Sequence, residues 1–98
     1  MLFTEKVLKL TKRIPKGKVT TYKIIAEKLN TKAYRAVGTA LHKNKRPIII
    51  PCHRVVNSNR FVGNYGKGIQ KKIELLKKEN IKIKNKKIQD FEKALFRF

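Results

Sequence analysis

The chain has 98 residues, of which 26 are Lys or Arg and six are Asp or Glu, so its net charge is +20. A chain of this length holds one hydrophobic core, and we expect a single domain over residues 1–98. With 41% hydrophobic residues it has enough apolar side chains to fold, which excludes a wholly disordered protein. The excess of positive charge predicts a polyanionic partner, with nucleic acid ahead of an anionic membrane surface.

The sequence also predicts where the protein is located in the cell and what its single cysteine can do. No apolar run approaches the roughly 20 residues needed to span a bilayer, and the N-terminus MLFTEKVLKL lacks the pattern of a secretion signal. We therefore expect a protein without membrane contact, in the cytoplasm beside the nucleoid or in the nucleus. The single cysteine, Cys52, has no partner for a disulfide and no Cys or His neighbours at metal-ligand spacing. We expect it to act as a free thiol, with no metal or organic cofactor.

Three helices are predicted in the first half of the chain. Apolar residues at near-helical spacing predict the first over residues 2–12. The second is capped by Thr20 or Thr21 and ends at about Leu29, and the third covers residues 32–44. The third helix is expected to bury one side, made of Ala33, Val37, Ala40 and Leu41. A tight turn between the second and third helices, with small residues and an Arg in the third, predicts a helix-turn-helix.

The second half mixes extended, loop and helical patterns. The apolar run 48–50 before Pro51 predicts a short buried extended segment that supports Cys52. Residues 57–68 are rich in turn formers and predict a loop or wing, whereas residues 69–79 predict a helix. The last stretch, residues 81–98, opens as a strand and closes as a short amphipathic helix through Phe91, Leu95 and Phe98, and from about residue 84 it forms a lysine-rich C-terminal extension. The expected fold is mainly α with a small β element, a winged helix-turn-helix-like single domain.

Four short motifs follow one another along the chain: TTYK around Tyr22, RAVG at 35–38, PCHRV at 51–55 and GNYGKG at 63–68. Together they resemble the DNA-binding, active-site domain of the O6-alkylguanine-DNA alkyltransferases, without the N-terminal domain that many members carry. PCHR alone could arise by chance, but four motifs in this order are specific. The resemblance implies a monomer that repairs double-stranded DNA containing O6-alkylguanine. The damaged guanine is flipped out of the duplex and loses its alkyl group to a cysteine that is never regenerated.

Cys52 is the expected alkyl acceptor. A free thiol is mostly protonated at neutral pH, so attack on an alkyl carbon requires a base. The resemblance implies a water-joined relay in which His53 takes the proton and Glu79 orients His53. Taken alone, Cys52 would be read as a small buried apolar residue, and Glu79 as a solvated partner of Lys77 or Lys78.

The third predicted helix carries the expected DNA contacts. The resemblance implies that Arg35 fills the gap left by the flipped nucleotide, while Tyr22 crowds the neighbouring phosphate and promotes the flip. The alternatives are a phosphate clamp for Arg35 and a half-buried core aromatic for Tyr22. The small residues Ala36 and Gly38 would let the helix approach the minor groove, although tight helix packing is also open. Lys43 completes the expected DNA contacts.

The remaining site residues also follow from the resemblance. Asn44 is implied to brace the turn before the active-site segment. His42 matches no catalytic residue of the family, and we expect it to make a backbone or phosphate contact. The implied base pocket consists of Val55, Asn64, Tyr65 and Gly66. In this pocket Tyr65 covers the base and donates toward the leaving guanine, and Gly66 replaces a serine common in relatives, so one contact to the base is expected to be missing. Alone, GNYG would be a glycine turn.

Two other functions stay open at this point. A non-catalytic alkyltransferase-like protein would bind and flip damaged guanine for another repair pathway, although such relatives replace the cysteine. A general basic DNA-binding protein would share the charge and carry PCHR incidentally. It would bind alkylated and unmodified duplexes alike.

Overall fold

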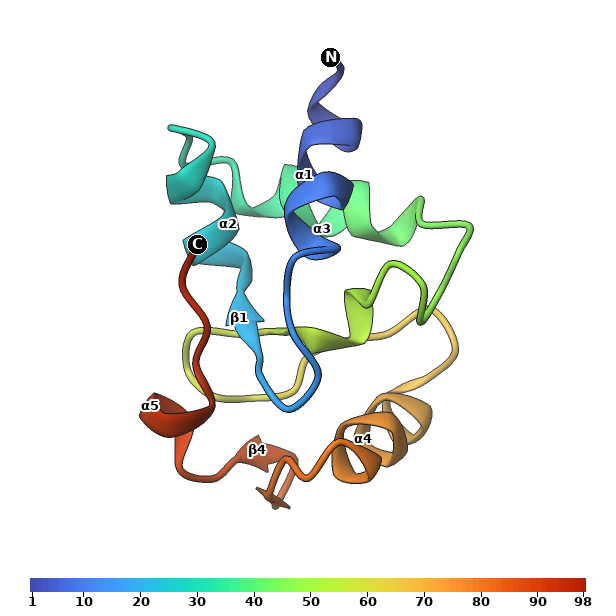
Figure 1. Cartoon of the computed structure of the whole chain (residues 1–98), viewed down its shortest axis with the longest axis vertical. Helices are drawn as coiled ribbons and strands as arrows, with labels where there is room; N and C mark the ends of the chain where they lie inside the picture. Colours follow the sequence, from blue (N-terminus) through green and yellow to red (C-terminus); the bar gives the residue numbers. More distant parts are fainter.

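The computed structural model describes residues 1–98 as two helical halves on either side of a short parallel strand pair (Figure 1). The upper half in Figure 1 holds α1 (Phe3–Thr11), α2 (Tyr22–Lys28) and α3 (Tyr34–His42). The lower half holds α4 (Ile69–Lys78), the hairpin β3 (Ile83–Lys84) and β4 (Lys87–Ile88), and α5 (Phe91–Ala94). Between them, β1 (Thr20–Thr21) pairs in parallel with β2 (Val55–Val56).

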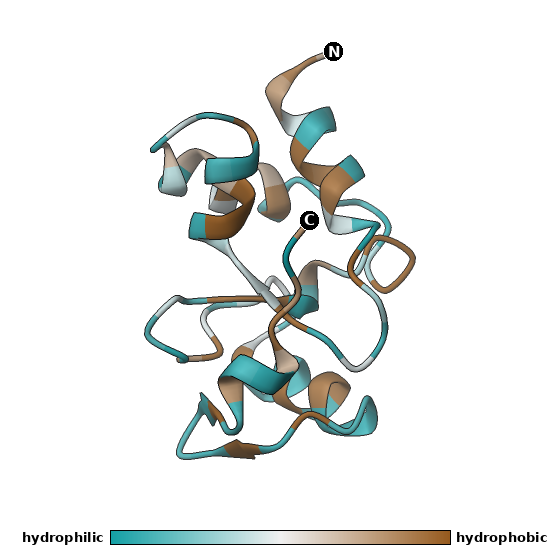
Figure 2. Ribbon diagram, turned by 60° about the vertical axis from the view of Figure 1, so that its left-hand side comes forward, coloured by the Kyte–Doolittle hydropathy of each residue, from teal (hydrophilic) through white to brown (hydrophobic).

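The central strand pair divides the hydrophobic core into two clusters. Successive side chains of a strand point to opposite faces, so Val55 joins the cluster under α1, α2 and α3, whereas Val56 joins the cluster over α4 and α5. Figure 2 shows hydrophobic and hydrophilic residues alternating along the helices, and the hydrophobic ones include the buried members of the two clusters. The residues just before β2 therefore lie where the two halves meet.

The helix-turn-helix is set by local signals. The Thr21 hydroxyl caps α2 by accepting a hydrogen bond from the Ile24 N–H at 3.0 Å. Asn30 then ends the helical stretch with a positive φ of 57°, a conformation that asparagine tolerates. In α3, Val37, Ala40 and Leu41 are buried as predicted. The prediction for Ala33 was wrong: it lies outside the first turn, at the N-cap position, and is exposed.

The predicted buried extended segment before Cys52 was also wrong. Ile48 and Ile49 are 57% and 65% exposed, and Ile48 has a φ of +77°, which is rare for a β-branched residue. The chain turns here because the Ile50 N–H bonds back to the Arg46 carbonyl at 2.9 Å. The support for Cys52 is instead a single 3-10 turn, η1 (Cys52–Arg54), which follows the buried Pro51 and leads directly into β2.

The lysine-rich stretch after α4 packs onto the domain. It forms the β3–β4 hairpin and buries Ile88 and Phe91 in the lower core cluster. The predicted terminal helix through Phe98 was too long, since α5 ends at Ala94 and the chain then becomes extended. This extended end runs beside Val19, whose N–H bonds to the Ala94 carbonyl at 2.9 Å and whose carbonyl accepts from the Phe96 N–H at 2.7 Å.

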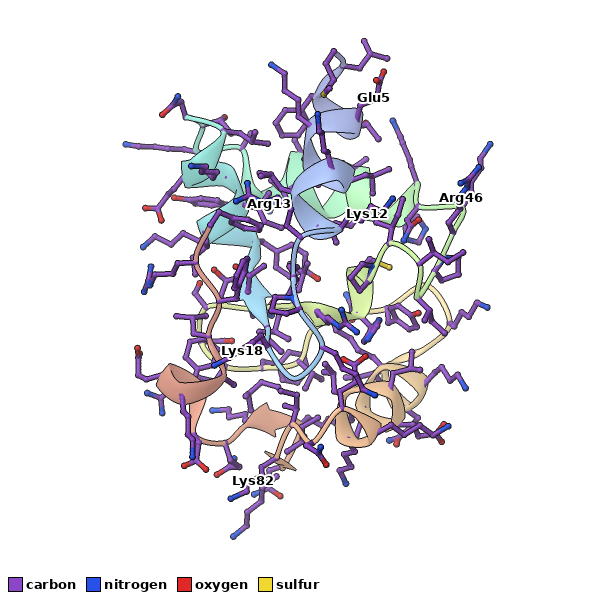
Figure 3. The ribbon with its side chains drawn as sticks, viewed as in Figure 1. Glu5, Lys12, Arg13, Lys18, Arg46 and Lys82 are labelled. Carbon is purple, nitrogen blue, oxygen red and sulfur yellow. The ribbon has the colours of Figure 1, made fainter.

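Basic side chains project from both halves of the molecule. Figure 3 labels Lys12 and Arg46 in the upper half and Lys82 at the lower end. Ion pairs are few: besides the partly buried pairs of Glu79 described below, one ion pair joins the exposed Lys82 and Asp90 at 3.6 Å. No helix combines the length and the apolar character that crossing a membrane would require.

Candidate active site

A hollow of about 830 Å³ opens on one face, lined by side chains of α2 and α3, by Cys52 and by the loop between β2 and α4. Its volume lies in the range of small-molecule pockets, about 300–1,000 Å³. Eight of the residues singled out from the sequence meet there: Tyr22, Arg35, Gly38, His42, Cys52, Asn64, Tyr65 and Gly66. Motifs far apart in the chain therefore share one site.

Six other predicted residues lie outside the lining of the hollow: Ala36, Lys43, Asn44, His53, Val55 and Glu79. Lys43 is exposed at the end of α3, and Ala36 is partly buried within it. Val55 differs most from expectation, because its side chain is fully buried in the upper core cluster. Only the main-chain atoms of Val55 could therefore contact a ligand in the hollow.

Cys52 and His53 face different surroundings although they are neighbours in the chain. The Cys52 thiol is free and partly exposed, and it lines the hollow. The next residue of the 3-10 turn, His53, is fully buried. The turn thus presents the sulfur to the hollow and keeps the imidazole behind it.

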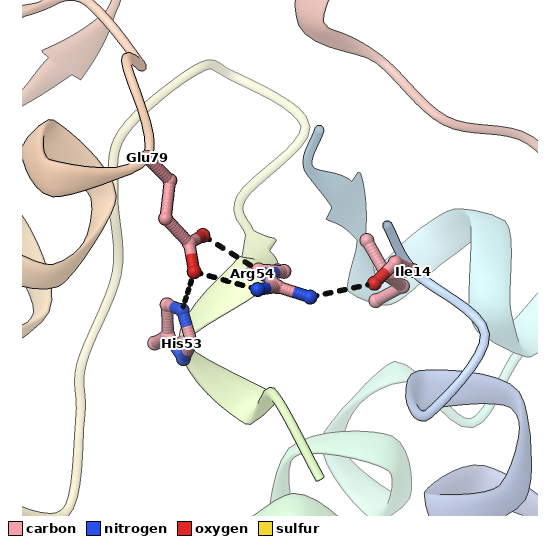
Figure 4. Close-up of polar contacts among 4 residues, drawn as sticks. All are labelled: Ile14, His53, Arg54 and Glu79. Atoms are coloured by element: carbon pink, nitrogen blue, oxygen red, sulfur yellow. Dashed lines mark hydrogen bonds and ion pairs between the residues drawn. The ribbon is translucent and has the colours of Figure 1, made fainter. Parts of the chain in front are cut away.

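Behind Cys52, one carboxylate is shared by two side chains (Figure 4). Glu79, the C-cap residue of α4, accepts from His53 Nε2 at 3.2 Å and from Arg54 Nε and a terminal Arg54 nitrogen at 2.9 and 2.6 Å. The other terminal nitrogen of Arg54 donates to the Ile14 carbonyl at 2.8 Å, just after α1. Arg54 therefore links both halves of the domain to the active-site turn.

These bonds fix the protonation of His53. An ionised carboxylate only accepts hydrogen bonds, so the proton of a neutral His53 must sit on Nε2, and Nδ1 carries a free lone pair. Nδ1 is buried and has no protein partner. Burial lowers the pKa of His53, outweighing the opposing effect of Glu79. Burial acts to raise the pKa of Glu79, but the hydrogen bonds from Arg54 and His53 lower it below its usual value. The result is a neutral base beside an ionised carboxylate.

Asn44 braces the loop that precedes Cys52. Its side-chain amide donates to the Ile50 carbonyl at 2.8 Å, and its side-chain oxygen accepts from the Arg46 N–H at 2.9 Å. These are the contacts expected of a residue that holds the turn between α3 and the active-site segment. Asn44 acts on the site through the backbone.

The exposed side of α3 forms one wall of the hollow. Tyr34, Arg35, Thr39 and His42 all line it, and all four side chains are exposed. With Lys23 from α2 they give the wall a basic character, and no acidic residue lines the hollow. This composition favours an anionic ligand along α3.

Two tyrosines complete the lining. Burial is the main cause that raises the pKa of both Tyr22 and Tyr65, and a negative charge on Cys52 would raise it further. The Tyr65 hydroxyl is buried without a protein partner although its side chain borders the hollow. Both phenols stay protonated at neutral pH and can donate a hydrogen bond.

Sequence reasoning passed over two residues that the structure brings to the site. Arg54 was part of the PCHR motif but was given no role. Lys72 was given no role either, yet it is fully buried and donates to the Val55 carbonyl at 2.7 Å and the Asn64 carbonyl at 3.2 Å. A signal was present, because Lys72 falls within the apolar stripe of α4, between Ile69 and Ile73.

Comparison with known proteins assigns the chain to a family. The family model for the 6-O-methylguanine DNA methyltransferase, DNA binding domain, matches residues 2–81. The chain belongs to this family. The resemblance inferred from the four motifs is confirmed, and family membership connects the chain with DNA repair, methyl transfer and DNA binding.

Curated relatives named methylated-DNA–protein-cysteine methyltransferase support the assignment. The protein of Methanocaldococcus vulcanius is 54% identical over 80 residues, which are 82% of this chain and 48% of that protein. The protein of Saccharolobus islandicus strain M.16.27 is 51% identical over 81 residues, 83% of this chain and 52% of the relative. The chain thus spans about half the length of the relatives that it matches.

Solved structures show the same fold. The Mycobacterium tuberculosis OGT in complex with DNA matches with a TM-score of 0.78 and 39% identity, over 81% of this chain and 50% of that one. S. pombe Atl1, in complex with damaged DNA containing O6-carboxymethylguanine, matches with a TM-score of 0.83 and 26% identity. The Atl1 match covers 98% of this chain and 95% of the other. The predicted fold, mainly helical and helix-turn-helix-like with a small sheet, is confirmed.

Proposed function

We propose that this protein repairs double-stranded DNA by accepting an alkyl group from O6-alkylguanine onto Sγ of Cys52. The observation that carries the proposal is the position of Cys52, whose thiol lines the hollow beside α3 while His53 and Glu79 lie directly behind it. Nucleophile, base and orienting carboxylate are the three parts that an activated thiol requires. Relatives named methylated-DNA–protein-cysteine methyltransferase match about four fifths of the chain.

The reaction balances with the groups present. The Cys52 thiol gives its proton through a water molecule to Nδ1 of His53, and the resulting thiolate attacks the alkyl carbon. The S–C bond forms as the O6–C bond breaks. The guanine anion that leaves takes up a proton from water, while Tyr65 donates a hydrogen bond toward it, and the base returns to its normal form in DNA. His53 then releases to water the proton that it took from the thiol, so the number of protons is unchanged. The product is a stable thioether on Cys52, so each molecule acts once.

The base must leave the duplex before the sulfur can reach it. In this proposal α3 lies in the minor groove, Arg35 occupies the gap in the stack, and Tyr22 crowds the phosphate beside the flipped nucleotide. Asn64, Tyr65, Gly66 and the main chain of Val55 then surround the guanine. The basic wall of the hollow supports this placement, because phosphates lie along both edges of the groove.

A second candidate function is lesion recognition without chemistry. It is favoured by one observation, the match along nearly the whole chain to S. pombe Atl1 bound to damaged DNA. In that case the hollow would hold the alkylated guanine and Cys52 would stay unmodified. The presence of a thiol backed by His53 and Glu79 favours transfer.

Intact-protein mass spectrometry separates the two candidates. Equimolar protein and a duplex with one O6-methylguanine are mixed, and we expect the protein to gain the mass of one methylene, with none gained by Cys52→Ala or with an unmodified duplex. A protein that binds the damaged duplex selectively but keeps its mass would be a lesion-recognition protein. Equal binding of damaged and unmodified duplexes, with no mass change, would leave a general DNA-binding protein.

A further inference from the structure

The C-terminal hairpin adds two strands beside the loop that lines the hollow. One edge of β4 pairs with β3, and its other edge forms an antiparallel bridge with Phe61 of that loop. The Val62 N–H donates to the Lys86 carbonyl, and the Ile88 N–H donates to the Arg60 carbonyl, both at 2.9 Å. The surface of the hairpin is therefore continuous with one wall of the hollow.

The register of these strands places a row of side chains on one face. Residues directly opposite each other in an antiparallel pair carry their side chains on the same face. Lys84 is opposite Lys87, and Lys87 is opposite Phe61, which lines the hollow. Ile83 and Ile88 are opposite each other on the other face, which packs on the lower core cluster. The three side chains of the first face form a row that leads away from the hollow.

The row puts two like charges opposite each other. Lys84 and Lys87 are both exposed, and like charges at directly opposed positions destabilise a strand pair. Residues 80–89 contain no acidic side chain that could offset this repulsion. The next acidic residue, Asp90, already pairs with Lys82 at 3.6 Å. The hairpin therefore keeps a local cost that nothing within the protein relieves.

The turn of the hairpin fixes this arrangement. Asn85 and Lys86 both have a positive φ, of 53° and 61°, which is the conformation of a two-residue type I′ turn. A turn of this kind sets the register of the two strands that it joins. The facing lysines are thus built into the hairpin, and an anionic partner would relieve their repulsion.

We propose that the exposed face of this hairpin is a second DNA-binding surface, on which Lys84 and Lys87 bind neighbouring phosphates of one strand. A nucleotide in the hollow lies between α3 and Phe61, and its strand continues over the row. Lysine suits this contact because its ammonium is a point charge on a flexible stem. The hairpin lies beyond residues 2–81, which match the family model. The surface rests on the DNA binding of the proposed function and does not require alkyl transfer.

The first test measures how binding to an unmodified duplex depends on salt, by fluorescence anisotropy. The double variant Lys84→Gln/Lys87→Gln is compared with wild type and with Lys6→Gln/Lys9→Gln. The second variant removes the same charge from exposed positions on α1, none of whose residues lines the hollow. We expect the slope of log affinity against log salt to become shallower by about two in the hairpin variant and to change far less in the control. An unchanged slope in the hairpin variant, or an equal change in both variants, would overturn the proposal.

A second measurement tests the repulsion without DNA. Lys87→Glu places opposite charges across the hairpin, whereas Lys86→Glu makes the same change of net charge at the turn, where no lysine is opposite. We expect the melting temperature, followed by circular dichroism, to be a few degrees higher for Lys87→Glu than for Lys86→Glu. The same Lys87→Glu variant should bind the duplex more weakly than Lys86→Glu. Equal melting temperatures and equal affinities would contradict the proposal.

A third measurement locates the phosphates. A duplex with one O6-methylguanine fixes the register of the bound protein, and Cys52→Ala prevents transfer during the measurement. Single phosphates are replaced in turn by uncharged methylphosphonates, and the affinity for each duplex is measured. We expect two neighbouring replacements on one strand to weaken binding by Cys52→Ala and to have no effect once Lys84→Gln/Lys87→Gln is added. A set of replacements that acts equally with and without the hairpin lysines would place the hairpin off the DNA.

Failure of the proposed function gives a different result from failure of the hairpin surface. A protein with no preference for the methylated duplex, whose hairpin variant has the shallower salt slope, binds DNA through the hairpin without recognising the lesion. A protein that prefers the methylated duplex, but whose hairpin variant keeps the slope of wild type, recognises the lesion without the hairpin, and the proposal is then wrong.

Discussion

The Glu79 carboxylate is shared between Arg54 and His53, and this sharing determines how the site responds to acid. Arg54 approaches both carboxylate oxygens, so it holds the plane of the group. His53 uses the oxygen that faces the active-site turn. Arg54 therefore holds the Glu79 carboxylate in place, and Glu79 in turn fixes the tautomer of His53.

Acid should destabilise the protein through these two groups. The pKa of Glu79 is lowered in the folded state, so its stabilisation is present above pH 4.5 and is lost as the pH falls through the folded value. The pKa of His53 is also lowered, so the unfolded chain takes up its proton first as the pH falls below about 6.5. Both groups therefore lower the stability of the folded protein as the pH falls. We expect the melting temperature, followed by circular dichroism, to fall steadily from pH 7 to pH 4.

The variant Glu79→Gln tests how much of this loss of stability in acid comes from the Glu79 carboxylate. It removes the ionised partner of Arg54 and His53, so it should be less stable than wild type at pH 7, by about 2 to 4 kcal/mol for a partly buried pair. The difference should shrink toward pH 4. Glu74→Gln, an exposed change on the same helix, serves as the control. A constant difference across this pH range would mean that Glu79 contributes through packing and not through its charge.

At this scale the motifs predicted which side chains lie together around Cys52, but not the cations behind them. His53 follows Cys52 in the chain and bonds to Glu79, as the resemblance implied, whereas the roles of these residues in transfer stay a prediction. Lys72 was not found, because burial of a lysine is decided by where α4 packs, and composition makes every lysine look solvated. The direction of the Val55 side chain could not be predicted from the sequence either, since it depends on the pairing of β2 with β1.

Among the elements, the helix-turn-helix was predicted well and the segment before Cys52 was not. Helices carry capping and periodicity signals, such as Thr21 and the buried stripe of α3, that act over a few residues. The apolar run 48–50 gave the wrong result because apolar residues are also found exposed in loops. It is visible in Figure 2 as a hydrophobic loop at the edge of the molecule. Its path follows from hydrogen bonds of Asn44 and Arg46, which periodicity does not report.

The function of α3 can be tested through Arg35. If this side chain fills the gap left by the flipped nucleotide, Arg35→Ala should slow transfer from a duplex by at least about tenfold, because a few kcal/mol of unstacking is no longer compensated. Transfer from a single-stranded oligonucleotide, which has no stack to restore, should change far less. Arg97→Ala removes the same charge from an exposed position outside the hollow and is the matched control. An equal loss on both substrates would make Arg35 a phosphate clamp.

For the whole molecule, the two core clusters hold the Cys52 turn in place, whereas the net charge attracts DNA. The clusters meet at the β1–β2 pair and at Arg54, so the active-site turn is held by both halves of the domain. The net charge of +20 comes from 26 lysines and arginines distributed along the whole chain, and attraction of this kind does not distinguish one duplex from another. It supplies affinity for any duplex, in which each neutralised phosphate releases counterions.

Binding should therefore depend steeply on salt while discrimination does not. With roughly four phosphates neutralised, affinity for an unmodified duplex should fall about a hundredfold between about 50 and 200 mM salt. The ratio of affinities for damaged and unmodified duplexes should change little, because the residues proposed to surround the guanine, Asn64, Tyr65 and Gly66, carry no charge. Lys23→Gln, at the hollow, should reduce the slope of log affinity against log salt by about one. Lys84→Gln, on the β3–β4 hairpin, should leave that slope unchanged if DNA binds along α3 alone, and an equal decrease in both variants would place DNA over the hairpin as well.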